Sequence, residues 1–142
     1  MAKYHQGKYK PKNPSKYKGN PTNIIYRSSW ECRFMAYCDK HPDIVEWSSE
    51  EYIVPYISPV DNRVHRYFPD FVVKMRDDRI IMIEIKPKHQ TKPPKMNGKA
   101  SKTYIHELYT YGINTAKWDA ARSYCKKKGW SFEILSEDEI KV

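Results

Sequence analysis

Residues 69–86, Pro-Asp-Phe-Val-Val-Lys-Met-Arg-Asp-Asp-Arg-Ile-Ile-Met-Ile-Glu-Ile-Lys, contain the pattern that decides the fold of this chain. Two runs rich in Val, Ile and Phe, 71–75 and 80–86, flank the polar turn 76–79, which is typical of a β-hairpin. The second run is apolar on both faces, as expected of a strand in the middle of a sheet. Such a hairpin places Asp70, at the start of one strand, beside Glu84, late in the other.

The hairpin also predicts a chemical site. Because side chains alternate along a strand, Glu84 and Lys86 share a face, and with Asp70 they bring two carboxylates and an ammonium group together. Two carboxylates and the Ile85 carbonyl suit Mg²⁺, with Mn²⁺ able to substitute. The ion would polarise a phosphodiester, and Lys86 would act as a base or stabilise charge on the phosphate. The structural alternative is that Glu84 only pairs with Lys86 or Arg66.

The rest of the chain predicts an α/β fold. A Ser-x-x-Glu capping box at 28–31 begins a helix that ends before Pro42. Helical spacing from Tyr104 to Lys128, with Gly129 as the C-cap, predicts a long second helix. Short strands are expected at 44–47, 51–57, 64–68 and 130–135, and one more helical turn after Ser136. Together these elements predict a mixed β-sheet flanked by helices.

The formal charge of +9 over 142 residues is concentrated in two segments. Residues 1–22 and 85–102 each contain six Lys and no acidic residue, whereas 23–84 contain eleven acidic and eight basic residues. The first segment predicts a basic, flexible N-terminal arm before a domain at 23–142, and residues 87–102 predict an exposed lysine-rich loop. Lysines neutralise phosphates and interleaved tyrosines stack on bases. The alternative for the arm is a solubilising segment that binds nothing specific.

The candidate DNA-binding residues lie in these two segments, just before Asp70 and on the long helix, where Asn114 and Lys117 share a face. They are Lys8, Lys10, Lys12, Lys16, Lys18, His65, Arg66, Lys88, Gln90, Lys92, Lys95 and Lys117. Most would contact phosphates, so we expect little sequence preference.

Composition argues against several other classes of protein. The longest apolar run, Ile80–Ile83, is too short to span a bilayer, and no signal peptide opens the chain. The three cysteines include no Cys-x-x-Cys pair, which argues against a disulfide scaffold or a zinc site. An apolar fraction of 39% is enough for a packed core. We therefore expect a single-domain intracellular protein with no membrane partner.

Pro69-Asp70 followed by Glu84-x-Lys86 resembles the PD-(D/E)XK nuclease superfamily. Segments 26–31, 65–71 and 116–121 are similar to its TnsA-type branch. Segments 13–19, 84–87, 90–94 and 125–132 are similar to the head-completion nucleases of tailed phages. The resemblance covers almost the whole chain and implies a restriction-endonuclease-like core.

The resemblance also implies roles for individual residues. It implies a Mg²⁺-dependent endonuclease acting on double-stranded DNA, with Asp70 and Glu84 as metal ligands, Lys86 as a catalytic residue and Glu31 completing the metal-side acids. Glu31 has a simpler alternative as the third residue of the capping box. The implied role is phage head completion: cutting packaged DNA at the portal before the tail attaches. Portal or neck proteins would be the partners, in the host cytoplasm and in the head–neck region of the virion.

Two other interpretations stay open. One is a DNA-binding structural protein of the head or portal without catalytic activity, although a complete acid–acid–lysine set argues against it. The other is a junction-resolving or transposon-type nuclease of the same superfamily. A transposon-type nuclease would carry a further domain, and a resolvase would form a tight dimer that prefers four-way junctions.

Overall fold

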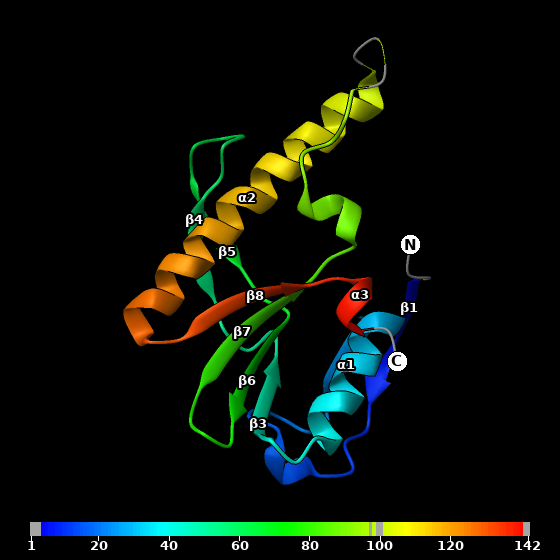
Figure 1. Ribbon diagram of the computed structural model, residues 1–142, viewed down its shortest axis with the longest axis vertical. Coiled ribbons are helices and arrows are strands. Elements are labelled where there is room, and N and C mark those ends of the chain that lie inside the picture. The colour runs from blue at the N-terminus through cyan, green and yellow to red at the C-terminus, as the bar shows by residue number, and fades with distance from the viewer. Residues whose placement is uncertain (1–3, 97, 99–100, 141–142) are drawn as a thin grey trace.

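A four-stranded sheet lies at the centre of the computed structural model, which describes residues 4–96, 98 and 101–140 (Figure 1). The strand order is β3-β6-β7-β8. β3 (Ile44–Ser49), β6 (Phe71–Met75) and β7 (Ile80–Ile85) pair antiparallel, and β8 (Ser131–Leu135) pairs parallel with β7. The sheet is mixed and flanked by helices, which confirms the predicted α/β, restriction-endonuclease-like class.

The predicted hairpin is formed by β6 and β7. Phe71 lies opposite Ile83, and Val73 lies opposite Ile81. In the turn, Asp78 adopts a positive φ of 72° and its amide donates a hydrogen bond to the Met75 carbonyl at 3.0 Å. This register brings residues 70 and 84 side by side at the open end of the hairpin. β7 is an interior strand, as its two apolar faces predicted.

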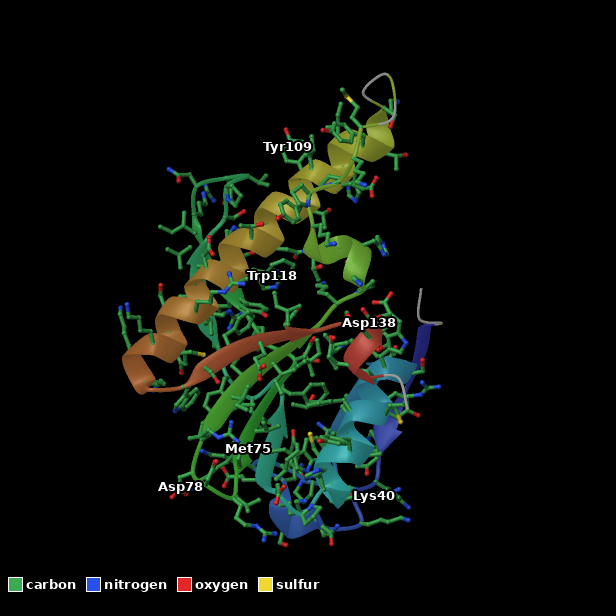
Figure 2. The ribbon with its side chains drawn as sticks, viewed as in Figure 1. Lys40, Met75, Asp78, Tyr109, Trp118 and Asp138 are labelled. Carbon is green, nitrogen blue, oxygen red and sulfur yellow. The ribbon has the colours of Figure 1, made fainter. Side chains whose placement is uncertain are left out.

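Helices cover both faces of the sheet. α1 (Ser29–Lys40) and α3 (Glu137–Ile140) lie on one face and α2 (Lys102–Lys128) on the other (Figure 1). Alternation along β6 explains the two cores, because Phe71 and Val73 pack with α1 whereas Val72 packs with α2. Figure 2 shows Trp118 where α2 crosses the sheet, and this side chain is only 4% exposed.

The helix ends follow the sequence signals. The Ser28 hydroxyl accepts a hydrogen bond from the Glu31 amide at 3.1 Å, and Gly129 ends α2 in the left-handed region with φ 76°. The amino-terminal half of α2, which carries Tyr109, projects beyond the sheet (Figure 2). Within the described residues, no helix combines the length and apolarity that crossing a membrane requires.

A separate two-stranded sheet packs against α2. Its strands, β4 (Val54–Ile57) and β5 (Val64–Tyr67), are antiparallel and shorter than the predicted runs 51–57 and 64–68. Val54, Tyr56 and Tyr67 are buried with Trp118 in the second core. This packing carries the end of β5 toward the Asp70–Glu84 hairpin.

The N-terminal segment differs from the predicted flexible arm. β1 (Tyr4–Tyr9) pairs antiparallel with β2 (Ile24–Ser28), a strand that the sequence did not predict, and a 3-10 turn, η1 (Pro14–Lys16), lies between them. Tyr17 is 6% exposed, and its ring packs edge-on against Trp47. Residues 1–3 of the predicted arm lie outside the described residues. The described part of the segment is therefore built into the domain, across the predicted boundary at residue 22.

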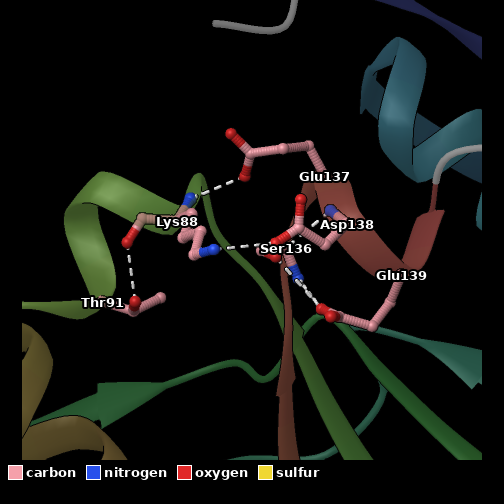
Figure 3. A network of polar contacts seen from close by, with 6 residues as sticks. All are labelled: Lys88, Thr91, Ser136, Glu137, Asp138 and Glu139. Atoms are coloured by element: carbon pink, nitrogen blue, oxygen red, sulfur yellow. Dashed lines mark hydrogen bonds and ion pairs between the residues drawn. The ribbon is translucent and has the colours of Figure 1, made fainter.

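The lysine-rich loop is anchored at its start. It contains a 3-10 turn, η2 (Lys88–Thr91), and runs beside the amino-terminal half of α2 (Figure 1). Figure 3 shows Lys88 held by α3: its amide donates to the Glu137 carboxylate at 2.7 Å, and its ammonium lies 3.1 Å from the Asp138 carboxylate. Residues 97, 99 and 100 of the predicted loop lie outside the described part of the chain.

Candidate active site

Asp70 and Glu84 meet at the open end of the hairpin. The Ile85 amide donates a hydrogen bond to Asp70 Oδ2 at 2.7 Å, which ties the carboxylate of one strand to the backbone of the next. Glu84 is 6% exposed and Asp70 is partly buried. The structure thus brings together the two carboxylates that the sequence placed on neighbouring strands.

Three side chains surround the Glu84 carboxylate. The Tyr67 hydroxyl donates a hydrogen bond to Oε1 at 2.5 Å, and the Lys86 ammonium lies 3.8 Å from Oε2. The Lys117 ammonium reaches the same place from α2, where it lies 5.6 Å from the centre of the Tyr67 ring and 5.8 Å from that of Tyr56. Lys86 and Lys117 therefore approach the carboxylates from two different elements.

Tyr67 is a site residue that sequence reasoning missed. It ends β5, on a sheet separate from the one that carries Glu84. Nothing local in the sequence relates the two residues, because their contact depends on how β4 and β5 pack against α2. The available signal was only an aromatic residue three positions before Asp70.

Burial and mutual repulsion disfavour two charges on the acidic pair. Burial, together with the charges of Glu84 and Glu31, raises the pKa of Asp70 well above its usual range, despite the Ile85 hydrogen bond. Burial also raises the pKa of Glu84, against the hydrogen bond from Tyr67 and the charges of Lys86 and Lys117. A cation at this place would relieve the repulsion.

The donor set fits a hard divalent cation. Mg²⁺ is commonly held by one or two carboxylates and completes its shell with water and substrate phosphate, which Asp70 and Glu84 allow. Within the described residues, no group of three or more His, Cys, Asp or Glu side chains lies close enough together to hold a metal. Asp70 and Glu84 are the two carboxylates that this site offers to such an ion.

Glu31 does not join that pair. Its Oε1 accepts a hydrogen bond from the Arg27 amide at 3.1 Å, and its own amide donates to the Ser28 hydroxyl. The bond to Ser28 is that of a capping box, whereas the carboxylate accepts from Arg27, one residue before the cap, instead of from the Ser28 amide. Its charge still contributes to the raised pKa of Asp70. The role of Glu31 in metal binding remains a prediction, while its contacts in the structure serve the start of α1.

The predicted DNA-binding residues of the lysine-rich loop and of β5 have different surroundings. Gln90 and Lys92 line a pocket between the lysine-rich loop and α2, and Lys95 is exposed further along the loop. His65 and Arg66 are exposed on β5: the His65 ring bonds the Asp61 carboxylate at 2.7 Å, and Arg66 lies over the Phe68 ring.

The lysines of the N-terminal segment lie elsewhere. In Figure 1 the chain between β1 and β2 is at the lower end of the molecule and the lysine-rich loop is at the upper end. Lys16 donates hydrogen bonds to the Asp39 and His41 carbonyls at 3.0 Å, and Lys18 donates to the Tyr52 hydroxyl. Lys8, Lys10 and Lys12 are exposed. Both basic segments were predicted to bind DNA, and the structure places the chain between β1 and β2 and the lysine-rich loop at different ends of the molecule.

Comparison with known proteins places this arrangement in a family. The model of the TnsA-like endonuclease N-terminal family matches residues 41–137, which include Asp70, Glu84 and Lys86 but not Glu31. The chain is also 42% identical to the head completion nuclease of Enterobacteria phage T4, over 97% of this chain and 95% of the relative. Because the family match spans most of the chain and contains the whole acid–acid–lysine site, the chain belongs to the TnsA-like endonucleases of the PD-(D/E)XK superfamily.

Proposed function

We propose that this protein is a Mg²⁺-dependent endonuclease that hydrolyses phosphodiester bonds of double-stranded DNA. The observation that carries the proposal is the convergence of Asp70, Glu84 and Lys86 at the end of the β6–β7 hairpin. Asp70 and Glu84 would hold Mg²⁺, or Mn²⁺ in its place. When bound, the ion supplies Lewis-acid activation of the phosphate and lowers the pKa of an attacking water.

The protein's own groups orient this chemistry. The Ile85 amide donates to Asp70 Oδ2 and the Tyr67 hydroxyl donates to Glu84 Oε1, so hydrogen bonds fix the orientation of the two carboxylates that would hold the ion. Lys86, beside Glu84, orients the attacking water or stabilises the charge that develops on the phosphate. Lys117 adds a second positive charge that holds the substrate phosphate in register.

The biological role follows from the similarity to a protein named head completion nuclease. We infer that the substrate is packaged phage DNA, cut at the portal before the tail attaches, with portal or neck proteins as partners. The reaction would take place in the cytoplasm of the infected host, and the protein would then lie in the head–neck region of the virion. The exposed lysines of the loop suit contact with DNA phosphates of any sequence.

A plasmid-nicking time course with Mg²⁺ and with EDTA tests the activity. We expect metal-dependent cutting that falls at least about 100-fold in Asp70→Asn and in Lys86→Ala, since each removes a group that acts on the reacting phosphate. Lys40→Ala is the matched control, because Lys40 is exposed at the far end of α1 (Figure 2).

The opposite results identify the alternatives. Cutting that survives Lys86→Ala would show that the active site lies elsewhere. Wild-type protein that binds DNA in a salt-sensitive way but does not cut would favour a structural head protein. A dimer in gel filtration that prefers four-way junctions would favour a junction resolvase.

A further inference from the structure

A pocket of about 210 Å³ lies between the start of the lysine-rich loop and α2. Its lining includes polar or aromatic side chains from both walls. They include His89, Gln90 and Lys92 on the loop, and His106, Tyr111 and Asn114 on α2. Nothing in the proposed hydrolysis requires His89, His106, Tyr111 or Asn114, so their common location needs another explanation.

Asn114 is the strongest sign that the pocket is built for a ligand. Its side chain is only 6% exposed, yet in the described part of the chain it makes no hydrogen bond with the protein, and neither do the side chains of the other five residues. Buried amides are nearly always hydrogen-bonded, because an unpaired polar group loses its water without compensation. Among the described residues, the fully enclosed side-chain nitrogens or oxygens without a partner are the indole nitrogens of Trp47 and Trp118, not the Asn114 amide. The Asn114 amide therefore keeps access to the pocket, where a ligand can be its hydrogen-bond partner.

The chemistry of the lining selects that partner. The amides of Gln90 and Asn114 each pair a donor with an acceptor, which is the pattern that reads the edge of a nucleobase. Lys92 and the two imidazoles supply donors for a phosphate, and the Tyr111 ring offers a flat apolar face on which a base stacks. Glu107 also lines the pocket and excludes a purely anionic ligand such as inorganic phosphate alone.

Both walls of the pocket belong to segments that also carry a lysine of the candidate active site. Asn114 lies three residues before Lys117 on α2, about 4.5 Å along the helix axis, and Gln90 follows Lys86 by four residues. A DNA strand advances about 3.4 Å per nucleotide along the duplex axis, which is close to the axial distance from Lys117 to Asn114, so neighbouring nucleotides of one strand can lie beside these two residues. The volume leaves room for one planar base.

We propose that this pocket binds one unpaired nucleotide of the DNA strand, next to the phosphate at the carboxylates. The proposal deepens the nuclease function and rests on it for the position of the strand. Its consequence is a preference for DNA with an unpaired end or flap over continuous duplex, without a preference for sequence in the paired part.

Fluorescence anisotropy with the full-length protein in EDTA tests this proposal without any cutting. The probes are a blunt duplex, the same duplex with a short single-stranded extension at either the 3′ or the 5′ end, and versions in which the extension is abasic. We expect one extension to bind about tenfold tighter than the blunt duplex, the size of one good base contact, and the abasic extension to lose this gain.

Two variants test whether the tighter binding of the extended duplex depends on the pocket. In Asn114→Ala and Gln90→Ala the ratio of extended to blunt affinity should fall to about one. Ser123→Ala should keep it, because Ser123 is exposed and nine residues beyond Asn114, on the opposite side of α2. If Asn114→Ala does not fold, Gln90→Ala on the partly exposed loop decides alone.

A ratio near one in the wild type, or a gain that survives both variants, overturns the pocket assignment. The nuclease proposal fails separately: a protein that selects the extension but never cuts DNA keeps the pocket and loses the hydrolysis. A protein that cuts DNA but binds both probes equally keeps the hydrolysis and loses the pocket.

Discussion

Asp39 lies on α1 with none of its surface exposed, and the N-terminal segment is hydrogen-bonded around it. Its carboxylate accepts from the Tyr9 hydroxyl at 2.9 Å, the Lys12 amide at 2.7 Å and the Asn13 amide at 3.0 Å. Its carbonyl accepts from the Lys16 ammonium. A buried charge is tolerated when it is fully hydrogen-bonded. The Asp39 side chain therefore holds the N-terminal segment, which is rich in lysine and has few apolar residues, against the domain.

We expect Asp39→Asn to lower the free energy of unfolding by about 2–3 kcal/mol near neutral pH, because it weakens hydrogen bonds to a charged acceptor. Burial alone would raise the pKa of Asp39, but the bonds from Lys12, Tyr9 and Asn13 outweigh it and hold the pKa below its usual value. The stabilisation is therefore complete above the unfolded-state pKa and disappears as the pH falls through the folded-state pKa.

Urea unfolding of wild type and Asp39→Asn across the acid range measures this dependence. The gap between the two proteins should close toward low pH. Hydrogen exchange at the Lys12 and Asn13 amides should quicken in the variant. A constant gap at all pH values would assign the effect to packing and not to the carboxylate charge.

Tyr67 is a positioning residue for Glu84. Its hydrogen bond favours the charged form of the carboxylate, so Tyr67→Phe should raise the pKa of Glu84 further. Below that pKa the carboxyl is protonated and holds a cation poorly. We expect the acidic limb of the pH–rate profile for cleavage to move to higher pH. The cleavage rate at neutral pH should fall about tenfold, as for other groups that orient metal ligands.

The pH–rate profile is the decisive measurement for Tyr67, because a merely structural role would lower the rate without moving the limb. Tyr56→Phe is the matched control. Tyr56 also contributes a ring beside Lys117, but its hydroxyl makes no hydrogen bond to Glu84 among the described contacts. Superimposable profiles for wild type and Tyr67→Phe would remove Tyr67 from the site.

Among the elements, α2 has one glycine inside it, Gly112, and one at its C-cap, Gly129, and their replacement should have opposite effects. Gly129 has φ 76°, and an added Cβ would meet no atom within 4 Å, so only the backbone conformation opposes a side chain there. Gly112 is inside the helix with ordinary φ, and its added Cβ would lie 4.0 Å from the Pro59 side chain. We expect Gly129→Ala to destabilise the protein by about 1 kcal/mol and Gly112→Ala to stabilise it by about 0.5–1 kcal/mol.

Thermal unfolding of the two variants checks this pair with the same chemical change at both positions. A stabilised Gly129→Ala would mean that the end of α2 does not use the left-handed cap. A destabilised Gly112→Ala would mean that α2 bends or packs more tightly near Pro59.

A feature of this molecule could be predicted from the sequence when its cause is local, and could not when its cause lies in a distant part of the chain. The β6–β7 hairpin and the Asp70–Glu84 pair follow from alternation and a polar turn within eighteen residues, so both could be predicted. β1 has little apolar alternation. It pairs with β2, and the Tyr9 hydroxyl at its end and the Lys12 and Asn13 amides after it donate to Asp39 on α1, so its support comes from distant parts of the chain. The Tyr67–Glu84 contact joins two sheets and has no local signal.

At the scale of the whole molecule, folding divides the positive charge between two ends. In each basic segment at least one lysine is engaged within the protein: Lys16 donates to two backbone carbonyls, and Lys88 pairs with Asp138. Lys92 and Lys95 are exposed and form no ion pair among the described contacts. A lysine whose ammonium group is already paired within the protein neutralises DNA phosphates less well, so its binding releases fewer counterions. These lysines should therefore not contribute equally to DNA binding.

The salt dependence of DNA binding separates these contributions. Each lysine that neutralises one phosphate adds about 0.9 to the slope of log affinity against log salt. We expect Lys92→Ala and Lys95→Ala each to reduce the slope by about that amount, and Lys88→Ala to reduce it by less than half as much, since its ammonium lies 3.1 Å from Asp138. Anisotropy titrations in EDTA over a range of salt give the slopes. If Lys10→Ala reduced the slope while both loop variants left it unchanged, DNA would lie along the N-terminal segment, at the end of the molecule remote from the carboxylates, and the loop would need another role.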